Sequence, residues 1–430
     1  MRISAKASMN GKQILLAAII TGAALAGQSP QLRTDINPAL LYYQGFLTAP
    51  DPMANVDSDY LNSKKAREQK WPEKFGTILA GYDHEFEFVR QAAHAKVPCD
   101  WGVDLSRGPE TMLPHLGRAK FACQVGQWRT IWALQNGRQE NARDELVAAF
   151  VLGRNAGSGD LFISALIQGI VEGMCCTTIA AHFGEFTPET FQQIVEGFDA
   201  APARHSMAAC VKSERELGDW VLKKVLELQK TFPSDNAKFM TGLHDSGLVT
   251  ALSTIGYTNF WPRLVAASGG TSDGVLKLLR ETEPLWPRIS EIMTAPQPEY
   301  DAKVKQFTVD TGNSQNPFFT LFYALFNGWD LGTTHFKLRQ REFRAETQVA
   351  MVHAAAAYKL RGEPALKSVT DPFGNGPFAY KRFEFKGKDR GFELKSAYTG
   401  ADAPFVMIFV EKQGPAFEVF GAEAGKALTQ

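Results

Sequence analysis

Apolar residues recur at intervals of three and four along most of the chain, which is the pattern of helices that bury one face. Phe75, Ile78, Leu79 and Tyr82 give one clear example. The same spacing, interrupted by Pro and Gly, predicts helices over residues 38–47, 73–96, 113–136, 140–152, 161–183, 202–230, 273–293, 298–307 and 317–360, with one more beginning at Pro188. We therefore expect a mainly α protein.

Two neighbouring helices in this series are expected to form a hairpin. Gly137 separates them, and the small side chains of Ala133 and Ala142 allow antiparallel helices to approach closely. No second copy of this pattern follows at a period of 34 residues. A multi-helix bundle of α-hairpins is therefore favoured, with a solenoid-like stack of hairpins as the open alternative. Residues 161–183 are apolar on nearly every side, which predicts a central buried helix.

The hydrophobic period changes near the C-terminal end. Residues 378–385, 391–397 and 404–411 are short runs separated by turn-forming residues, and they predict three strands. A small antiparallel sheet must cover its apolar face, and the end of the long helix 317–360 is the nearest element. Residues 231–272, rich in Ser, Thr and Gly, are expected to form a loop over the bundle.

The first 26 residues follow the three-part plan of a secretory signal. They carry three basic residues and no acid, then an apolar run from Ile14, and they end in small residues up to Ala26. The 13 residues from Ile14 to Ala26 are fewer than the roughly 20 that a membrane-spanning helix needs. Cleavage after Ala26 is therefore favoured, with an uncleaved N-terminal anchor as the alternative. No other run of 18 apolar residues follows, so we expect no transmembrane segment after cleavage.

Three segments are expected: a signal peptide over 1–26, a helical body over 27–365, and a β-containing module over 366–430. The chain has 430 residues, 44% of them hydrophobic and 21% charged, which is a globular composition. Its 46 Lys and Arg balance its 46 Asp and Glu, and loss of the three bases in the signal leaves 43. This balance offers no electrostatic attraction for nucleic acid, so we expect no nucleic-acid partner.

Five cysteines must be interpreted in an exported protein, where disulfides persist. Cys99 and Cys123 flank a loop containing Gly and Pro, and a bridge between them would contribute roughly 3 kcal/mol in the chain-entropy model. We expect this disulfide. Cys175 and Cys176 are adjacent in an apolar helical stretch and are expected to be buried thiols, although either could meet Cys210. Paired C-x-x-C spacing is absent, so the sequence does not predict a structural zinc site.

The C-terminal 80 residues resemble the last module of type II secretion pseudopilins. The resemblance lies in the helix end 355–362, in Asp371–Tyr380 (DPFGNGPFAY) and in Gly391–Ser396 (GFELKS). Similar tails end many uncharacterised secreted helical bacterial proteins, which the Cys99–Gly102 segment (CDWG) also resembles. The resemblance implies a helix packed on a small sheet. Major pseudopilins bind calcium in the following loop, but residues 397–402 supply one carboxylate, so we expect no calcium site.

Few residues point to chemistry, and the common catalytic motifs are missing from the sequence. His84 and Glu87 share one helix face at i, i+3 spacing, which suits a metal ligand pair or a general base, or else an ordinary charged surface. Asp100, beside Trp101, could line a cleft or hydrogen-bond the backbone of its turn. We assign no catalytic residue, cofactor or metal.

Two hypotheses of function follow. The first is an exported, soluble, non-enzymatic helical scaffold or interaction protein in the periplasm or outside the cell, whose partner is an unidentified protein or the envelope. The second is an extracytoplasmic hydrolase-like or small-ligand-binding protein with a cleft between helices, drawing on His84, Glu87 and Asp100. Sites are assembled in space, so missing sequence motifs do not decide between the hypotheses.

The signal peptide is tested by the mature N-terminus. When the full chain is expressed in a bacterium with a general secretory pathway, the exported protein is expected to begin at Gly27, as read by N-terminal sequencing. Placing a charge in the apolar run with Leu16→Arg should leave residues 1–26 attached, because a charged residue is costly in the bilayer. Recovery of a membrane-bound wild-type chain that retains its first residues would support the anchor instead.

Overall fold

The computed structural model describes residues 33–250, 259–297, 299–312, 314–320, 322, 338–400, 403–421 and 423–428. Within them the chain is mainly helical and ends in one small antiparallel sheet, so the predicted fold class is confirmed. The predicted signal peptide, residues 1–26, lies outside the described residues.

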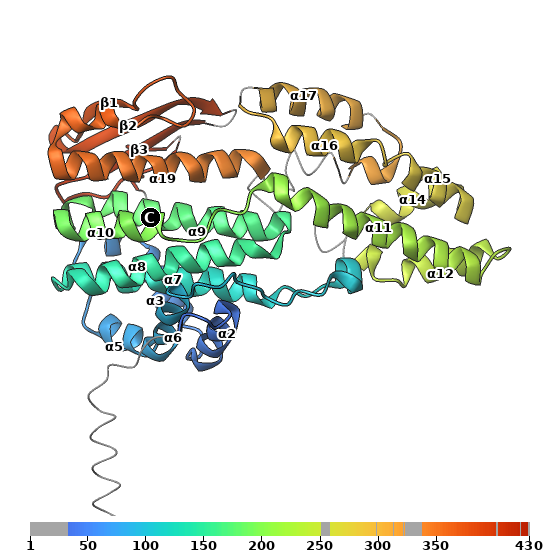
Figure 1. The fold of residues 1–430 in the computed structure, drawn as a ribbon, viewed down its shortest axis with the longest axis horizontal. Coiled ribbons are helices and arrows are strands. Elements are labelled where there is room, and N and C mark those ends of the chain that lie inside the picture. The colour runs from blue at the N-terminus through green and yellow to red at the C-terminus, as the bar shows by residue number, and fades with distance from the viewer. Residues whose placement is uncertain are drawn as a thin grey trace, which may run out of the picture.

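The helical body is stacked in layers (Figure 1). The first layer holds short helices, α2 (Pro38–Thr48), α3 (Asn55–Asn62), α4 (Lys64–Glu68), α5 (Lys74–Ala80) and α6 (Asp83–Ala93). The next layers hold α7 (Pro114–Gln135) with α8 (Gln139–Ala156), then α9 (Phe162–Ala181) with α10 (Pro188–Asp199), then α19 (Leu338–Arg361). The remaining described helices extend to one side, namely α11 (Met207–Thr231), α12 (Asn236–His244), α14 (Phe260–Ser268), α15 (Ser272–Arg280), α16 (Leu285–Thr294) and α17 (Glu299–Gly312).

The expected hairpin is formed by α7 and α8. Gly137 adopts a φ of +70° in the turn between them, a conformation that glycine reaches without steric cost. Helix α9, predicted to be central, packs on α7, α8 and α19. Among the described helices it alone is long and apolar enough to cross a membrane, and 67% of the tested stretch is buried inside the fold, as in the core helix of a globular protein.

Several predicted boundaries are wrong. The range 73–96 is two helices, α5 and α6, and the range 273–293 is also two, α15 and α16. Residues 231–272 are not one loop, because they include α12 and α14, whose Phe239 and Leu264 are fully buried. Both helices pack in a separate apolar cluster together with Val275, so tertiary burial outweighs their weak helical propensity. Residues 323–337 of the predicted long helix lie outside the described residues.

The C-terminal strands pair in sequence order, β1 (Ala379–Phe385), β2 (Lys388–Gly400) and β3 (Ala403–Val410). Their sheet packs on α19, as expected, and also on the end of α9. Phe183, just after α9, contacts Phe392 of β2 and Phe409 of β3 with ring centroids 5.3 and 5.5 Å away. Gly184 is required at this junction, because a Cβ atom there would lie 2.2 Å from the Glu411 carbonyl oxygen.

A buried aspartate fastens the start of this module. The Asp371 carboxylate, 2% exposed, accepts hydrogen bonds from the Ser396 hydroxyl at 2.9 Å, from the Ala397 amide at 2.6 Å and from the Phe373 amide at 3.0 Å. A buried carboxylate is tolerated only when such donors surround it. Asp371 therefore pins the turn before β1 to the middle of β2.

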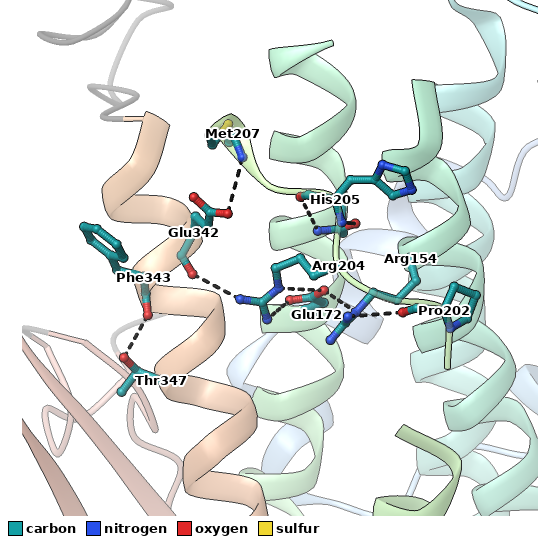
Figure 2. Close-up of polar contacts among 10 residues, drawn as sticks. Arg154, Glu172, Pro202, Arg204, His205, Met207, Glu342, Phe343 and Thr347 are labelled. Atoms are coloured by element: carbon teal, nitrogen blue, oxygen red, sulfur yellow. Dashed lines mark hydrogen bonds and ion pairs between the residues drawn. The ribbon is translucent and has the colours of Figure 1, made fainter. Parts of the chain in front are cut away.

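A buried charge cluster joins the helical layers (Figure 2). Glu172 of α9 is fully buried, and its carboxylate is paired with Arg154 of α8 at 2.5 Å and with Arg204 of the α10–α11 connection. Arg154 also donates to the Pro202 carbonyl oxygen at 3.2 Å. Two cations surround one carboxylate at this point of the core, which satisfies a charge that would otherwise be very unfavourable there.

The same connection is also held to α19. Arg204 donates to the Glu342 carbonyl oxygen at 3.4 Å, and the Glu342 carboxylate accepts from the Met207 amide at 3.3 Å. One turn before Glu172 on α9, the Gln168 side-chain amide exchanges two hydrogen bonds with the His205 backbone, at 3.1 and 3.2 Å. Polar contacts therefore hold the connection between α9 and α19 (Figure 2).

Removing the central carboxylate should strongly destabilise the protein. Glu172→Leu leaves two buried guanidinium groups uncompensated, and we expect the free energy of unfolding to fall by about 3–5 kcal/mol in urea denaturation. The control is Glu283→Leu, which removes the partner of Arg215 in a pair whose side chains are 50% and 42% exposed, and which should cost less than about 1 kcal/mol. Equal losses in the two variants would show that the buried pairing is not needed.

Candidate functional site

The three residues singled out in the sequence do not form a site together. His84 and Glu87 lie on α6 with side chains 85% and 60% exposed, and His84 Nδ1 is 3.9 Å from a Glu87 carboxylate oxygen. Asp100 lies on another segment, where its carboxylate accepts from the Gly102 amide at 2.9 Å. The structure thus places the pair on an open surface and the aspartate in a turn. In the part of the chain that is described, no group of three or more His, Cys, Asp or Glu could hold a metal ion.

The predicted disulfide is wrong, because all five cysteines are free and buried. The Cys123 thiol points to α8, where it donates to the Ala149 carbonyl oxygen at 3.3 Å. Cys99 instead lies near the Ser158 hydroxyl and the Ala39 backbone, and burial raises its pKa to about 12. Both thiols lie near Tyr42, but they make no bond to each other. Cys175, Cys176 and Cys210 are likewise separate thiols, and a raised pKa keeps each protonated.

A cavity of about 300 Å³ opens where the C-terminal module meets the helical body. Its walls come from α3, α4, α7, α9, strands β2 and β3, and the segment 413–420 that follows the sheet. That segment is tied to the body at two points: the Ala416 amide donates to Glu68 at 2.8 Å, and Gln413 donates to Glu185 at 2.5 Å. The cavity is therefore walled by residues 61–182 of the helical body together with residues 390–420.

Its lining combines aromatic rings with a few polar groups. The apolar part of the wall is formed by three buried aromatic residues, Trp71, Trp128 and Phe417. Gln127 donates from one amide nitrogen to the Met174 carbonyl oxygen and the Thr178 hydroxyl, both at 2.7 Å. This mixture of apolar surface with a small number of fixed polar groups is typical of small-molecule sites.

A histidine is fixed at the rim. His182 follows α9 and is 8% exposed, and its Nδ1 lies 2.8 Å from a Glu185 carboxylate oxygen. The same oxygen accepts from Gln413, so Glu185 joins the histidine to the C-terminal segment. The contact at Nδ1 orients the ring and leaves Nε2 as the nitrogen that can meet a ligand.

The most unusual group in the lining is Arg390. In the pairing of β1 with β2, Phe383 faces Gly391 and Glu384 faces Asp389, so Arg390 is the extra residue of a β-bulge. Gly391 has a φ of +148°, and a Cβ atom there would lie 1.9 Å from the Phe409 carbonyl oxygen. A bulge turns a side chain away from the regular alternation of the strand.

Arg390 is a buried residue whose guanidinium lies in the cavity wall without a counter-charge. The residue is 4% exposed, and its Nε donates to the Lys412 carbonyl oxygen at 2.7 Å. Among the described residues no carboxylate lies within ion-pair distance of it, and its terminal nitrogens make no hydrogen bond. Burial lowers the pKa of this guanidinium. Phe417 packs against it, with its ring centroid 5.8 Å from the Arg390 Cζ atom.

Two other buried groups, Glu85 and His115, have shifted pKa values and lie outside the cavity. Burial raises the pKa of Glu85 to about 7, an effect that Arg118 and Arg129 partly oppose, and one of its carboxylate oxygens has no hydrogen-bond partner. Burial lowers the pKa of His115 to about 4, and its ring stacks on Trp101 with centroids 4.6 Å apart. These groups lie within the packed N-terminal layers and do not line the cavity.

Comparison of the chain with protein families, with curated proteins and with solved structures finds no match. The candidate site therefore stands on the geometry alone. Sequence reasoning missed the cavity because its walls are far apart in the chain, with Glu68 and Ala416 separated by 348 positions. One local signal was available, since Gly391 at the start of the predicted strand 391–397 is a residue type that often marks a bulge.

The buried Glu85 gives a pH test. Its carboxyl binds a proton up to about pH 7 in the folded protein, whereas its ordinary pKa is 4.5, so its cost to stability grows as pH rises between these values. Glu85→Gln removes this titration. The difference in unfolding free energy between the variant and wild type should therefore shift in favour of the variant by about 2 kcal/mol as the pH rises from 5 to 8. The control Glu87→Gln, on the exposed face of the same helix, should show no such trend. If the stability difference between Glu85→Gln and wild type does not change with pH, the raised pKa of Glu85 is wrong.

Proposed function

We propose that the protein is an exported small-ligand-binding protein whose site is the cavity between the helical body and the C-terminal module. The observation that carries this proposal is the 300 Å³ cavity with aromatic walls and the buried Arg390 in its lining. The proposal develops the second of the two functions expected from the sequence. It assigns binding to the cavity and assigns no chemical step.

The volume and the composition of the cavity support a ligand of modest size. Ligand pockets in proteins begin at about 300 Å³ and combine apolar walls with a few polar groups that fix orientation. Here Trp71 and Trp128 supply wall, while Gln127 and His182 supply polar atoms already oriented by protein partners. Such preorganisation lowers the entropy that binding loses.

The position of the site supports a role in which ligand binding strengthens the contact between the helical body and the C-terminal module. Residues of α4, α7, α9, β2 and the segment 413–420 all contribute to the cavity, so a ligand would touch the body and the module at once. A ligand that binds only the folded protein adds to its stability through mass action. Export is part of the proposal on the strength of the N-terminal sequence described above.

Filling the cavity should abolish binding of an apolar probe. The fluorescence of N-phenyl-1-naphthylamine is expected to rise saturably with the wild-type protein, and Ile131→Trp, whose indole would occupy the space, should weaken that binding at least tenfold. The matched control is Ile163→Trp, the same change at a side chain 45% exposed and outside the cavity, which should bind as wild type does. If Ile131→Trp, folded by circular dichroism, binds the probe unchanged, the cavity is not a binding site.

A further inference from the structure

We infer that the cavity selects anionic ligands, with an oxyanion on the guanidinium of Arg390 and an apolar or aromatic body against the tryptophans. This inference rests on the proposed function and names the chemical class of ligand. It covers small organic acids that carry a carboxylate or a phosphate.

The first support is the isolation of the Arg390 charge. Most of the Arg390 side chain is buried, and a charge that leaves bulk water is normally paired, because an isolated charge there is costly. Three other arginines of the helical body are paired: Arg154 and Arg204 with Glu172, and Arg129 with Glu145. Arg390 lies beside Asp389, yet Asp389 pairs with Arg382 and Lys412 instead. In the described chain, its terminal nitrogens therefore have donor capacity that nothing uses.

The second support is the geometry that presents those nitrogens. The bulge turns Arg390 out of the strand alternation, and its Nε bond to the Lys412 carbonyl oxygen fixes the plane of the guanidinium. Gly414 lies directly over it, since a Cβ atom at that residue would come within 2.2 Å of Arg390 Nη1. Arg390 and Gly414 both line the cavity. An arginine held in one plane suits the two-point binding of a carboxylate or phosphate.

The third support is the charge balance of the whole lining. Two guanidinium groups contribute to it, Arg390 and the exposed Arg67, against one carboxylate, that of Glu418. The Glu185 carboxylate lies behind the lining, where it contacts His182 and Gln413. An anion beside Arg390 would meet a guanidinium that has no carboxylate partner among the described residues.

The apolar part of the ligand follows from the walls. Trp71 and Trp128 are 4% and 3% exposed, and the Trp71 indole nitrogen is already committed to the Ala66 carbonyl oxygen at 2.8 Å. These rings offer mainly apolar faces and edges to the cavity. A purely inorganic ion would leave this surface in contact with water, so an organic anion fits better.

The test uses two probes that differ by one group. 1-Anilinonaphthalene-8-sulfonate carries a sulfonate, and N-phenyl-1-naphthylamine is the same molecule without it. The wild-type protein should bind the sulfonate probe at least tenfold more tightly. Arg390→Gln should remove this preference, because it weakens binding of the sulfonate probe far more than binding of the neutral probe. Arg67→Gln, the same change at the exposed arginine of the cavity, should keep most of the preference for the sulfonate probe. Neither variant should lower the melting temperature markedly, since neither arginine is part of an ion pair.

A second variant leaves the charge in the protein and displaces it. Gly414→Ala puts a methyl group where the Arg390 guanidinium lies and should reduce the preference for the sulfonate probe as Arg390→Gln does. 1-Naphthoate or 1-naphthyl phosphate should displace the sulfonate probe from wild type, and the stronger competitor identifies the natural oxyanion as carboxylate or phosphate.

The outcomes separate the two proposals. Equal wild-type affinity for the two probes, or a preference that survives both Arg390→Gln and Gly414→Ala, would overturn anion selection while leaving a neutral binding site. Failure of both naphthyl anions to displace the sulfonate probe would also count against it. Unchanged binding of both probes by Ile131→Trp would instead overturn the cavity as the site, and with it the present inference.

Discussion

The structure depends on how one buried carboxylate is satisfied. Glu172 lies in the central helix α9, where an unpaired negative charge would be very unfavourable, and it is surrounded by Arg154 and Arg204. Arg204 comes from the α10–α11 connection and also binds a carbonyl oxygen of α19, so a single charge requirement orients α8, α9 and α19 together. Apolar packing supplies most of the stability, and a change that broke this pairing would leave an uncompensated charge in the core.

The position of α19 then determines where the C-terminal sheet lies. The sheet packs on α19 and on the end of α9, and Asp371 fixes its first turn to β2 through Ser396 and Ala397. Glu172 and Asp371 are both buried carboxylates whose partners are complete within the chain. Arg390, on the same strand as Ser396, is a buried charge whose partner is not. Glu172 and Asp371 thus stabilise the fold, whereas Arg390 faces a cavity and is the group to which we assign ligand binding.

Local patterns predicted most of the elements but little of their assembly. The hairpin at Gly137 and the three strands were predictable because turn chemistry and hydrophobic period are short-range signals. The helices within 231–272 were missed because Phe239 and Leu264 become buried only against other distant segments. The Cys99–Cys123 disulfide was predicted from loop length, which carries no information about the direction of the thiols. The cavity was beyond local reasoning altogether, since its walls come from segments that are far apart in the chain.

Arg390 also illustrates why a site of this kind leaves little trace in a sequence. One arginine in a strand normally lies on the solvated face, and only the register shift opposite Phe383 and Glu384 reverses that expectation. The backbone irregularity requires Gly391, which tolerates both the positive φ and the close approach of the Phe409 carbonyl oxygen. An unpaired buried cation lowers stability in the unliganded protein, and a bound anion would remove that cost. The same residue would therefore make the body and the module hold together more firmly when the cavity is occupied, which joins the architecture of the protein to its proposed function.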